Sequence, residues 1–143
     1  MYFDELEIGM TVDIEPTIIE KEKMLDFALN YDNIPLHTDE EYAKTTPFGK
    51  LIAPGVMSFM SVWNKYLDVD FFGEELLAGK STKIEWLKPV FAGDVLSGRA
   101  VVTNCVERNH KNGLVEVTIF VYNQEGVLVL TDVTEAIVKK KKY

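Results

Sequence analysis

The spacing of the apolar residues changes near residue 80, and this change limits the folds open to the chain. Before that point, apolar residues at helical spacing leave only a narrow polar stripe in the segment PGVMSFMSVWNKYL, residues 54–67. After it, segments rich in Val, Ile, Thr and aromatic residues show the period of two that is typical of β-strands. These segments are 81–90, 95–107, 114–123 and 127–138. The pattern predicts one buried helix followed by four strands.

Short polar segments separate the predicted strands. Residues 92–94, 109–113 and 123–126 each contain a glycine that can adopt positive φ in a tight connection. Such short connections favour an antiparallel meander. A further strand is predicted at 11–18, ahead of the helices, and a first helix at 20–31. The predicted fold class is therefore α+β, with a curved antiparallel sheet wrapped around the central helix.

Length and composition predict a single domain that spans residues 1–143. A chain of 143 residues with 47% hydrophobic residues can bury one core but not two, and no Pro/Gly/Ser linker interrupts it. A curved sheet of this kind covers one face with its own helix but leaves its edges open. Because edge pairing with a second copy closes such a sheet, we expect a homodimer or a multiple of it.

The charge argues against a nucleic-acid partner. The formal net charge is −8, although the chain includes four consecutive lysines at 139–142. The rest of the chain has 11 basic and 23 acidic side chains, whereas a protein that binds the phosphate backbone needs a positive field. We expect no nucleic-acid partner and interpret the lysines as a solvated end.

Apolar runs and cysteine content predict a soluble, cytoplasmic protein. No apolar run reaches the roughly 20 residues that a membrane-spanning helix needs, so we expect no membrane partner. The segment MYFDELEIG is acidic where a signal peptide would be basic and then apolar. Cys105 is the single cysteine and cannot form a disulfide within the chain.

Asp32 and His37 are the candidate catalytic residues. They lie in NYDNIPLHTDEEYA, where Pro35 must end the preceding helix and place both residues on a constrained loop. A carboxylate beside an imidazole can handle both protons of a water molecule. The residues alone also fit a structural capping interaction. Asp39 is interpreted as the cap of a second short helix within 39–46, and His110 as a solvated turn residue.

Gly55 is the candidate site for a developing negative charge. It opens the predicted central helix in LIAPGVMSF, where backbone N–H groups are unpaired within the helix and carry partial positive charge. Without a side chain, its amide can approach a thioester oxygen closely. An ordinary Pro-Gly helix start explains the same residues. No HExxH or CxxC pattern and no glycine-rich phosphate loop is present, so we expect no metal and no nucleotide cofactor.

The segment FALNYDNIPLHTDEEYAKTTPFGKLIAPGVM resembles the MaoC-like dehydratase family, and especially its (R)-specific enoyl-CoA hydratases. The matching positions are Asp32, Pro35, Leu36, His37, Asp39, Tyr42, Ala43, Phe48, Ile52, Ala53 and Gly55. The later segment KIEWLKPVFAGDVLSG is similar to the family's strand, Pro-Val step, Gly-Asp turn and next strand. The resemblance implies a hot-dog fold, an acyl-CoA thioester substrate that enters between protomers, and coenzyme A only as part of the substrate.

The resemblance also implies roles for the candidate residues. Asp32 and His37 would hold water or exchange the transferred proton, while the Gly55 amide would stabilise the enolate-like thioester oxygen. Three further positions depart from the family pattern and are predicted to contact substrate. These positions are Ile34, Pro54 and Trp63. A tryptophan at the last position is expected to narrow the acyl tunnel, which predicts a short, branched or otherwise unusual acyl group.

The implied activity is hydration of an enoyl-CoA or dehydration of a 3-hydroxyacyl-CoA. One alternative is a hot-dog thioesterase, because the same helix-start amide can polarise a thioester for attack by water. The other is a non-catalytic subunit that binds acyl-CoA. This second alternative is consistent with the departures at Tyr31, Ile34, Pro54 and Trp63.

Overall fold

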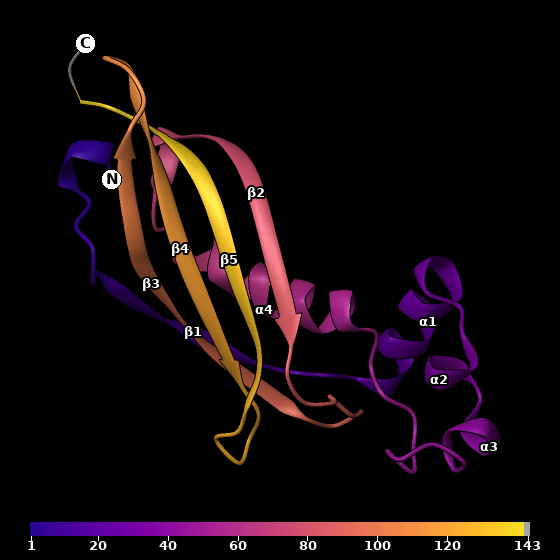
Figure 1. Cartoon of the computed structure of the whole chain (residues 1–143). Helices are drawn as coiled ribbons and strands as arrows, with labels where there is room; N and C mark the ends of the chain where they lie inside the picture. Colours follow the sequence, from indigo (N-terminus) through magenta and orange to yellow (C-terminus); the bar gives the residue numbers. More distant parts are fainter. Residues whose placement is uncertain (142–143) are drawn as a thin grey trace.

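A single antiparallel sheet with one long helix against it forms the body of the protein (Figure 1). The structure is a computed structural model that describes residues 1–141. The strands are β1 (Thr11–Ile18), β2 (Leu76–Trp86), β3 (Val95–Glu107), β4 (Asn112–Tyr122) and β5 (Leu128–Lys139). The helices are α1 (Lys21–Tyr31), α2 (Pro35–Thr38), α3 (Glu40–Ala43) and α4 (Gly55–Val69), with single 3-10 turns η1 (Phe3–Glu5) and η2 (Gly73–Glu75).

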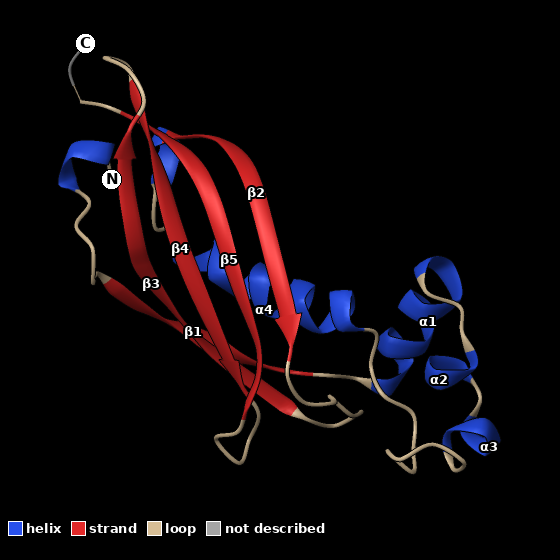
Figure 2. Cartoon of the chain, in the orientation of Figure 1, coloured by secondary structure: helices blue, strands red, loops and turns tan. Residues whose placement is uncertain are grey.

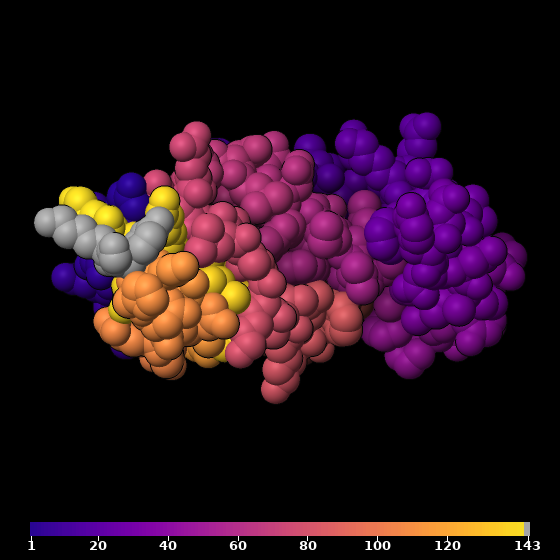
Figure 3. Space-filling view, turned by 90° about the horizontal axis from the view of Figure 1, so that it is seen from above, coloured from indigo at the N-terminus to yellow at the C-terminus, as the bar shows by residue number. Residues whose placement is uncertain are grey.

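The strand order is β1-β3-β4-β5-β2, so the two strands that flank the helical segment form opposite edges of the sheet. The chain must therefore cross the sheet between β1 and β2, and α4 lies against one face as it does so. Figure 2 shows α1, α2 and α3 grouped beyond one end of the sheet, away from the chain termini. The same group forms one end of the elongated molecule in the space-filling view of Figure 3. The predicted meander of β3, β4 and β5 and the α+β class are confirmed.

The core lies between α4 and the inner face of the sheet. Buried residues alternate strictly with partly exposed ones along β4, as a strand with one covered face requires. Val62 of α4 and Ile119 of β4 are almost fully buried in this core. Each such aliphatic side chain contributes roughly 1.5–3 kcal/mol by its removal from water. The alternation seen in the sequence therefore corresponds directly to the face that packs against α4.

One apolar side of α4 is not covered by the rest of the chain. The sequence predicts burial on nearly all sides, yet Val56, Met60 and Leu67 are each about half exposed. They recur at helical spacing and so form a stripe. Among the strands, α4 packs most closely against β1 and β3. Strand β2 is exposed along nearly its whole length and pairs only with β5. Within residues 1–141, nothing covers this stripe of α4 and no strand pairs with the outer edge of β2.

Two local predictions differ from the structure. The strand predicted to reach residue 90 ends at Trp86, because the N–H groups of Leu87 and Lys88 both donate to one carbonyl, that of Val129. The ladder is thereby broken, and the following Pro89 has no N–H to resume it. The predicted loop around His37 is instead the single helical turn α2. Proline is favourable at the first helical position, where an N–H would be unpaired anyway.

Asp132→Asn should make the stability of the protein depend less on pH. Asp132 is fully buried on β5, and burial raises the pKa of its carboxyl, partly offset by a hydrogen bond from Thr82. Above the unfolded-state pKa of about 3.9, the folded protein then binds more protons than the unfolded chain, so this group makes stability fall as pH rises. Thermal melts from about pH 4 upward should show a flatter slope for Asp132→Asn than for wild type. The exposed Asp13→Asn serves as control, and equal slopes would contradict the expected effect.

Candidate active site

A break between two helices brings Asp32 and His37 together. Asp32 is the C-terminal cap of α1, where its N–H donates to the carbonyl of Ala28. Pro35 begins α2 after an extended residue, as its preference for the first helical position predicts. The resulting turn places Nε2 of His37 3.2 Å from Oδ2 of Asp32. The five-residue separation, which would point two side chains apart on a continuous helix, allows them to converge here.

The two ring nitrogens of His37 have different partners, a backbone carbonyl and the carboxyl group of Asp32. Nδ1 lies 2.7 Å from the carbonyl oxygen of Ile52. Since a carbonyl only accepts, Nδ1 carries a hydrogen and Nε2 of a neutral ring would be an acceptor. A carboxylate is an acceptor too, so the contact with Asp32 is a hydrogen bond only when the two groups hold one further proton between them. His37 is buried and its side chain is 7% exposed, whereas that of Asp32 is 39% exposed.

The Asp32–His37 pair faces a cavity of about 270 Å³ at the start of α4. Gly55 and Ser58 of α4 line this cavity, together with Trp86 at the end of β2. The first N–H groups of a 15-residue helix such as α4 have no partner within the helix and attract negative charge. The cavity therefore combines a carboxyl–imidazole pair, a region of positive potential and an apolar wall.

Trp86 forms that wall because the residue opposite it is a glycine. A Cβ atom at position 55 would lie only 2.4 Å from the indole ring, well inside the 3.5–4.0 Å at which carbon atoms make favourable contact. The ring therefore packs against the backbone at the start of α4. The sequence did not predict that Trp86, Ser58 and Lys88 line this cavity. The strand alternation indicates which face Trp86 occupies but not that α4 begins beneath it.

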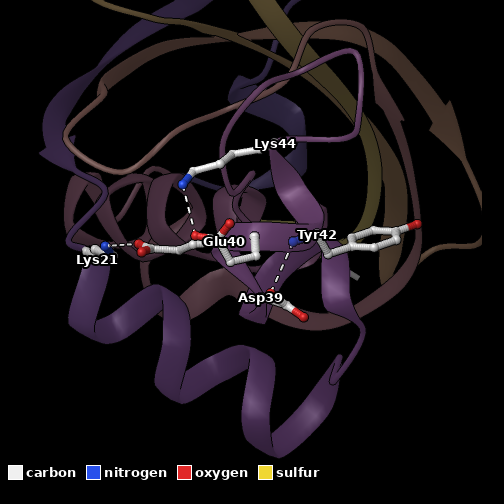
Figure 4. A network of polar contacts seen from close by, with 6 residues as sticks. Lys21, Asp39, Glu40, Tyr42 and Lys44 are labelled. Atoms are coloured by element: carbon white, nitrogen blue, oxygen red, sulfur yellow. Dashed lines mark hydrogen bonds and ion pairs between the residues drawn. The ribbon is translucent and has the colours of Figure 1, made fainter.

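Polar contacts at the surface link α1 to α3 (Figure 4). Lys21, at the start of α1, contacts Glu40 of α3, and this hydrogen bond lowers the pKa of the Glu40 carboxyl. Asp39 accepts a hydrogen bond from the N–H of Tyr42 at 3.1 Å. Asp39 is therefore a helix cap, as predicted.

The sequence model of the MaoC like domain matches residues 4–124. The chain belongs to the MaoC-like dehydratase family. A protein of Bacillus subtilis named as uncharacterized protein YdeM is 26% identical over 98% of this chain and 100% of its own length. The (R)-specific enoyl-CoA hydratase of Rhodospirillum rubrum is 32% identical over 73% of this chain and 72% of its own length.

The solved structures confirm the predicted hot-dog fold of this MaoC-like protein. A structure from Archaeoglobus, described as a monoamine oxidase regulatory protein, has a TM-score of 0.93 and 33% sequence identity. The match covers 99% of this chain and 95% of that one. The resemblance to (R)-specific enoyl-CoA hydratases found in the sequence is likewise confirmed at the level of the family.

The predicted site residues of the MaoC-like chain fall into two groups. Asp32, His37 and Gly55 line one cavity. The other three do not line it: Ile34 is exposed, Pro54 is the buried N-terminal cap of α4, and Trp63 lines a second cavity of about 160 Å³. Substrate contact by these three residues stays a prediction.

The described part of the MaoC-like chain contains neither a cluster of metal-ligating residues nor a membrane-spanning helix. Within residues 1–141, no three histidine, cysteine, aspartate or glutamate side chains are grouped so that they could hold a metal ion. None of the helices in the same part of the chain is both long and apolar enough to span a membrane. The titratable groups at the cavity are those already described, Asp32 and His37, with Lys88 at its lining.

Gly55→Ala should displace the indole of Trp86 without unfolding the protein. The added methyl group overlaps the ring, and the half-exposed side chain can swing toward solvent. Near-ultraviolet circular dichroism should show a changed tryptophan signal, with the melting temperature lowered by only a few degrees, roughly the effect of 1 kcal/mol. Gly79→Ala is the matched control, since nothing lies within 4 Å of its added Cβ. Identical spectra for Gly55→Ala and wild type would contradict this packing.

Proposed function

We propose that this chain adds water to the double bond of an enoyl-CoA thioester, or removes it from the corresponding 3-hydroxyacyl-CoA. The observation that supports this most is the 3.2 Å contact between Oδ2 of Asp32 and Nε2 of His37, at a cavity that is also lined by the start of α4. The similarity to the (R)-specific enoyl-CoA hydratase of Rhodospirillum rubrum supports the same reaction class. Coenzyme A takes part as a portion of the substrate, and no further cofactor is required.

The reaction needs one proton to leave water and one to reach carbon. In hydration, the water oxygen bonds to the β-carbon while the α-carbon receives a proton. Asp32 and His37 act as a unit that takes a proton from water and returns one to the α-carbon, so the pair ends each cycle as it began. The hydrogen bond from Nδ1 of His37 to the Ile52 carbonyl keeps Nε2 directed at Asp32.

Negative charge gathers on the thioester oxygen as the water oxygen attacks. The N–H groups at the start of α4, that of Gly55 first, are placed to stabilise this charge because they enter the reaction already oriented. Trp86 excludes water from one side of the cavity, which strengthens such electrostatic stabilisation. The substrate-binding roles of Ile34, Pro54 and Trp63 belong to the same proposal.

Asp32→Asn and His37→Ala should each reduce hydration of a short enoyl-CoA by about 10²–10⁴-fold in kcat/KM. Loss of the conjugated enoyl absorbance measures the rate. Asp13→Asn on β1 and His110→Ala in the β3–β4 turn are the matched controls and should keep wild-type rates. Absence of turnover of every enoyl- and 3-hydroxyacyl-CoA by wild-type protein would refute the proposal.

A thioesterase is the second candidate, since the amide-lined start of α4 would polarise a thioester for hydrolysis as well. Release of free coenzyme A, followed with a thiol reagent in the same reactions, separates the two activities. A non-catalytic acyl-CoA-binding subunit is the third, and predicts binding without loss of enoyl absorbance or release of thiol.

We further propose that the protein is a cytoplasmic homodimer. The unpaired edge of β2 and the exposed apolar stripe of α4 are surfaces that a second copy can cover. The single cysteine, Cys105, suits a reducing compartment.

Met60→Asp combined with Leu67→Asp should convert a dimer to a monomer. Both side chains are about half exposed in the isolated chain, and burying two carboxylates without partners in an interface is strongly unfavourable. Light scattering coupled to size-exclusion chromatography measures the mass. Ile8→Asp, at another exposed apolar position, should leave the mass unchanged. A wild-type monomer at high protein concentration would exclude the dimer.

A further inference from the structure

Two buried polar atoms between α4 and the sheet lack hydrogen-bond partners. They are the hydroxyl of Tyr66 on α4 and Oδ2 of Asp132 on β5. Asp132 is 0% exposed and Tyr66 is 5% exposed. Thr82 of β2 donates to the other carboxylate oxygen, but nothing within residues 1–141 satisfies these two atoms. Because buried polar groups almost always have a partner, this pair points to a polar group of a ligand or to a bound water.

The pair lies on the side of α4 that faces β2 and β5, and both cavities open on this same side. The catalytic cavity is lined by Gly55 at the start of α4 and by Trp86 at the end of β2. The second cavity is lined by Tyr66 of α4, Thr134 of β5 and Gly79 of β2. Figure 1 shows α4 running behind the sheet from the helical group toward the opposite end.

Along β5, Asp132 lies between Leu130, which pairs with Trp86 of the first cavity, and Thr134, which lines the second cavity together with Tyr66. Asp132 pairs across the ladder with Ile84, two residues before Trp86 on β2. Side chains on a helix lean toward its N-terminus, so the Tyr66 phenol is directed back toward the start of α4. An acyl chain whose thioester lies at Gly55 would meet these two polar atoms if it extended along this side of α4.

The chemistry of the pair favours a hydroxyl group over a hydrocarbon end. Burial first, and then the nearby Asp132, raise the pKa of Tyr66 to about 12, so the phenol keeps its proton and can donate it. A ligand hydroxyl can accept from Tyr66 and donate to Oδ2 of Asp132, which satisfies both atoms. A methyl group would satisfy neither and would leave them desolvated.

We propose that Tyr66 and Asp132 form the polar end of the acyl-binding pocket and select thioesters whose acyl chain carries a hydroxyl group near its distal end. This inference rests on the proposed acyl-CoA hydratase function. Tyr66 lies 11 residues after Gly55, about 16 Å along a helix, and its backward lean shortens that span. The distance suits an acyl chain of medium length. Trp63 lines the second cavity with Tyr66, and the centroids of their rings are 5.1 Å apart.

The test compares two enoyl-CoA substrates of equal chain length, one ending in a hydroxyl and one in a methyl group. Wild-type protein should prefer the hydroxylated substrate by more than tenfold in kcat/KM, since a site built to bond a hydroxyl rejects the analogue that lacks it. Tyr66→Phe and Asp132→Asn should each reduce this preference, the ratio of the two kcat/KM values, by about tenfold. Tyr122→Phe on β4 and Asp13→Asn on β1 are the matched controls and should keep the wild-type preference.

A chain-length series of both substrate types extends the comparison. The preference should be greatest at one intermediate length, because only then does the terminal hydroxyl reach the pair. Equal kcat/KM for the two types at every length, unchanged in Tyr66→Phe and Asp132→Asn, would overturn the proposal and leave the pair as the site of a structural water.

Failure of the proposed enzyme function would be visible separately. If neither substrate type is turned over, titration calorimetry with the two saturated CoA thioesters still measures recognition at the pair. Tighter binding of the hydroxylated thioester, lost in Asp132→Asn, would support the proposal without catalysis, and equal binding would overturn it. If Tyr66→Phe does not fold by circular dichroism, Asp132→Asn alone decides the outcome, because it keeps the shape of the buried side chain.

Discussion

The backbone at Ile52 and Ala53 connects the parts of the site to one another. The carbonyl of Ile52 bonds Nδ1 of His37 at 2.7 Å, and its N–H donates to the carbonyl of Leu36 in α2. The N–H of the next residue, Ala53, donates to the carbonyl of Val90 beyond β2. A single short segment thus fixes the imidazole, enters α4 two residues later and binds the chain that follows Trp86. These few backbone hydrogen bonds link the positions of Asp32 and His37, the start of α4 and the wall formed by Trp86.

The sheet supports this arrangement by fixing where α4 lies. The inner faces of β3, β4 and β5 are filled by aliphatic side chains that leave α4 no other buried position. On its β2 and β5 side, by contrast, the core includes Asp132, Thr134 and the hydroxyl of Tyr66. Polar groups in such a position reduce stability unless something satisfies them. Their presence beside two cavities, rather than in the tightly packed half of the core, fits a surface that receives a ligand.

The strand pattern of this chain was strong enough to predict most of the fold. The predicted strands at 11–18 and 95–107 have the observed bounds of β1 and β3, and the central helix was displaced by only one or two residues. Alternation succeeds because burial on one face repeats every second residue. The pattern did not predict that β2 ends before Lys88 and Pro89, where two N–H groups share the carbonyl of Val129. The sequence also predicted a loop at Pro35, where the structure has a helical turn.

The site was only partly predictable, for geometric reasons. The order of Asp32, His37 and Gly55 along the chain indicated the family, and the break at Pro35 permitted their convergence. The wall formed by Trp86 depends on the register between β2 and β5 and on the rotation of α4, which no local pattern encodes. The substrate contact predicted for Trp63 stays a prediction. Its position eight residues after Gly55 corresponds to about 12 Å along the helix axis, and the structure places it at a different cavity.

The net negative charge of the protein opposes the approach of an anionic ligand, so the local potential at the cavity matters for the proposed function. Coenzyme A thioesters carry phosphate groups, whereas this chain has a net charge of −8, so the overall field opposes their approach. Screening confines that repulsion to about 8 Å at physiological ionic strength. Within that distance the cavity presents the start of α4 and the ammonium group of Lys88, both positive. Under the proposed function, binding of an anionic thioester depends on these two local features rather than on the charge of the whole molecule.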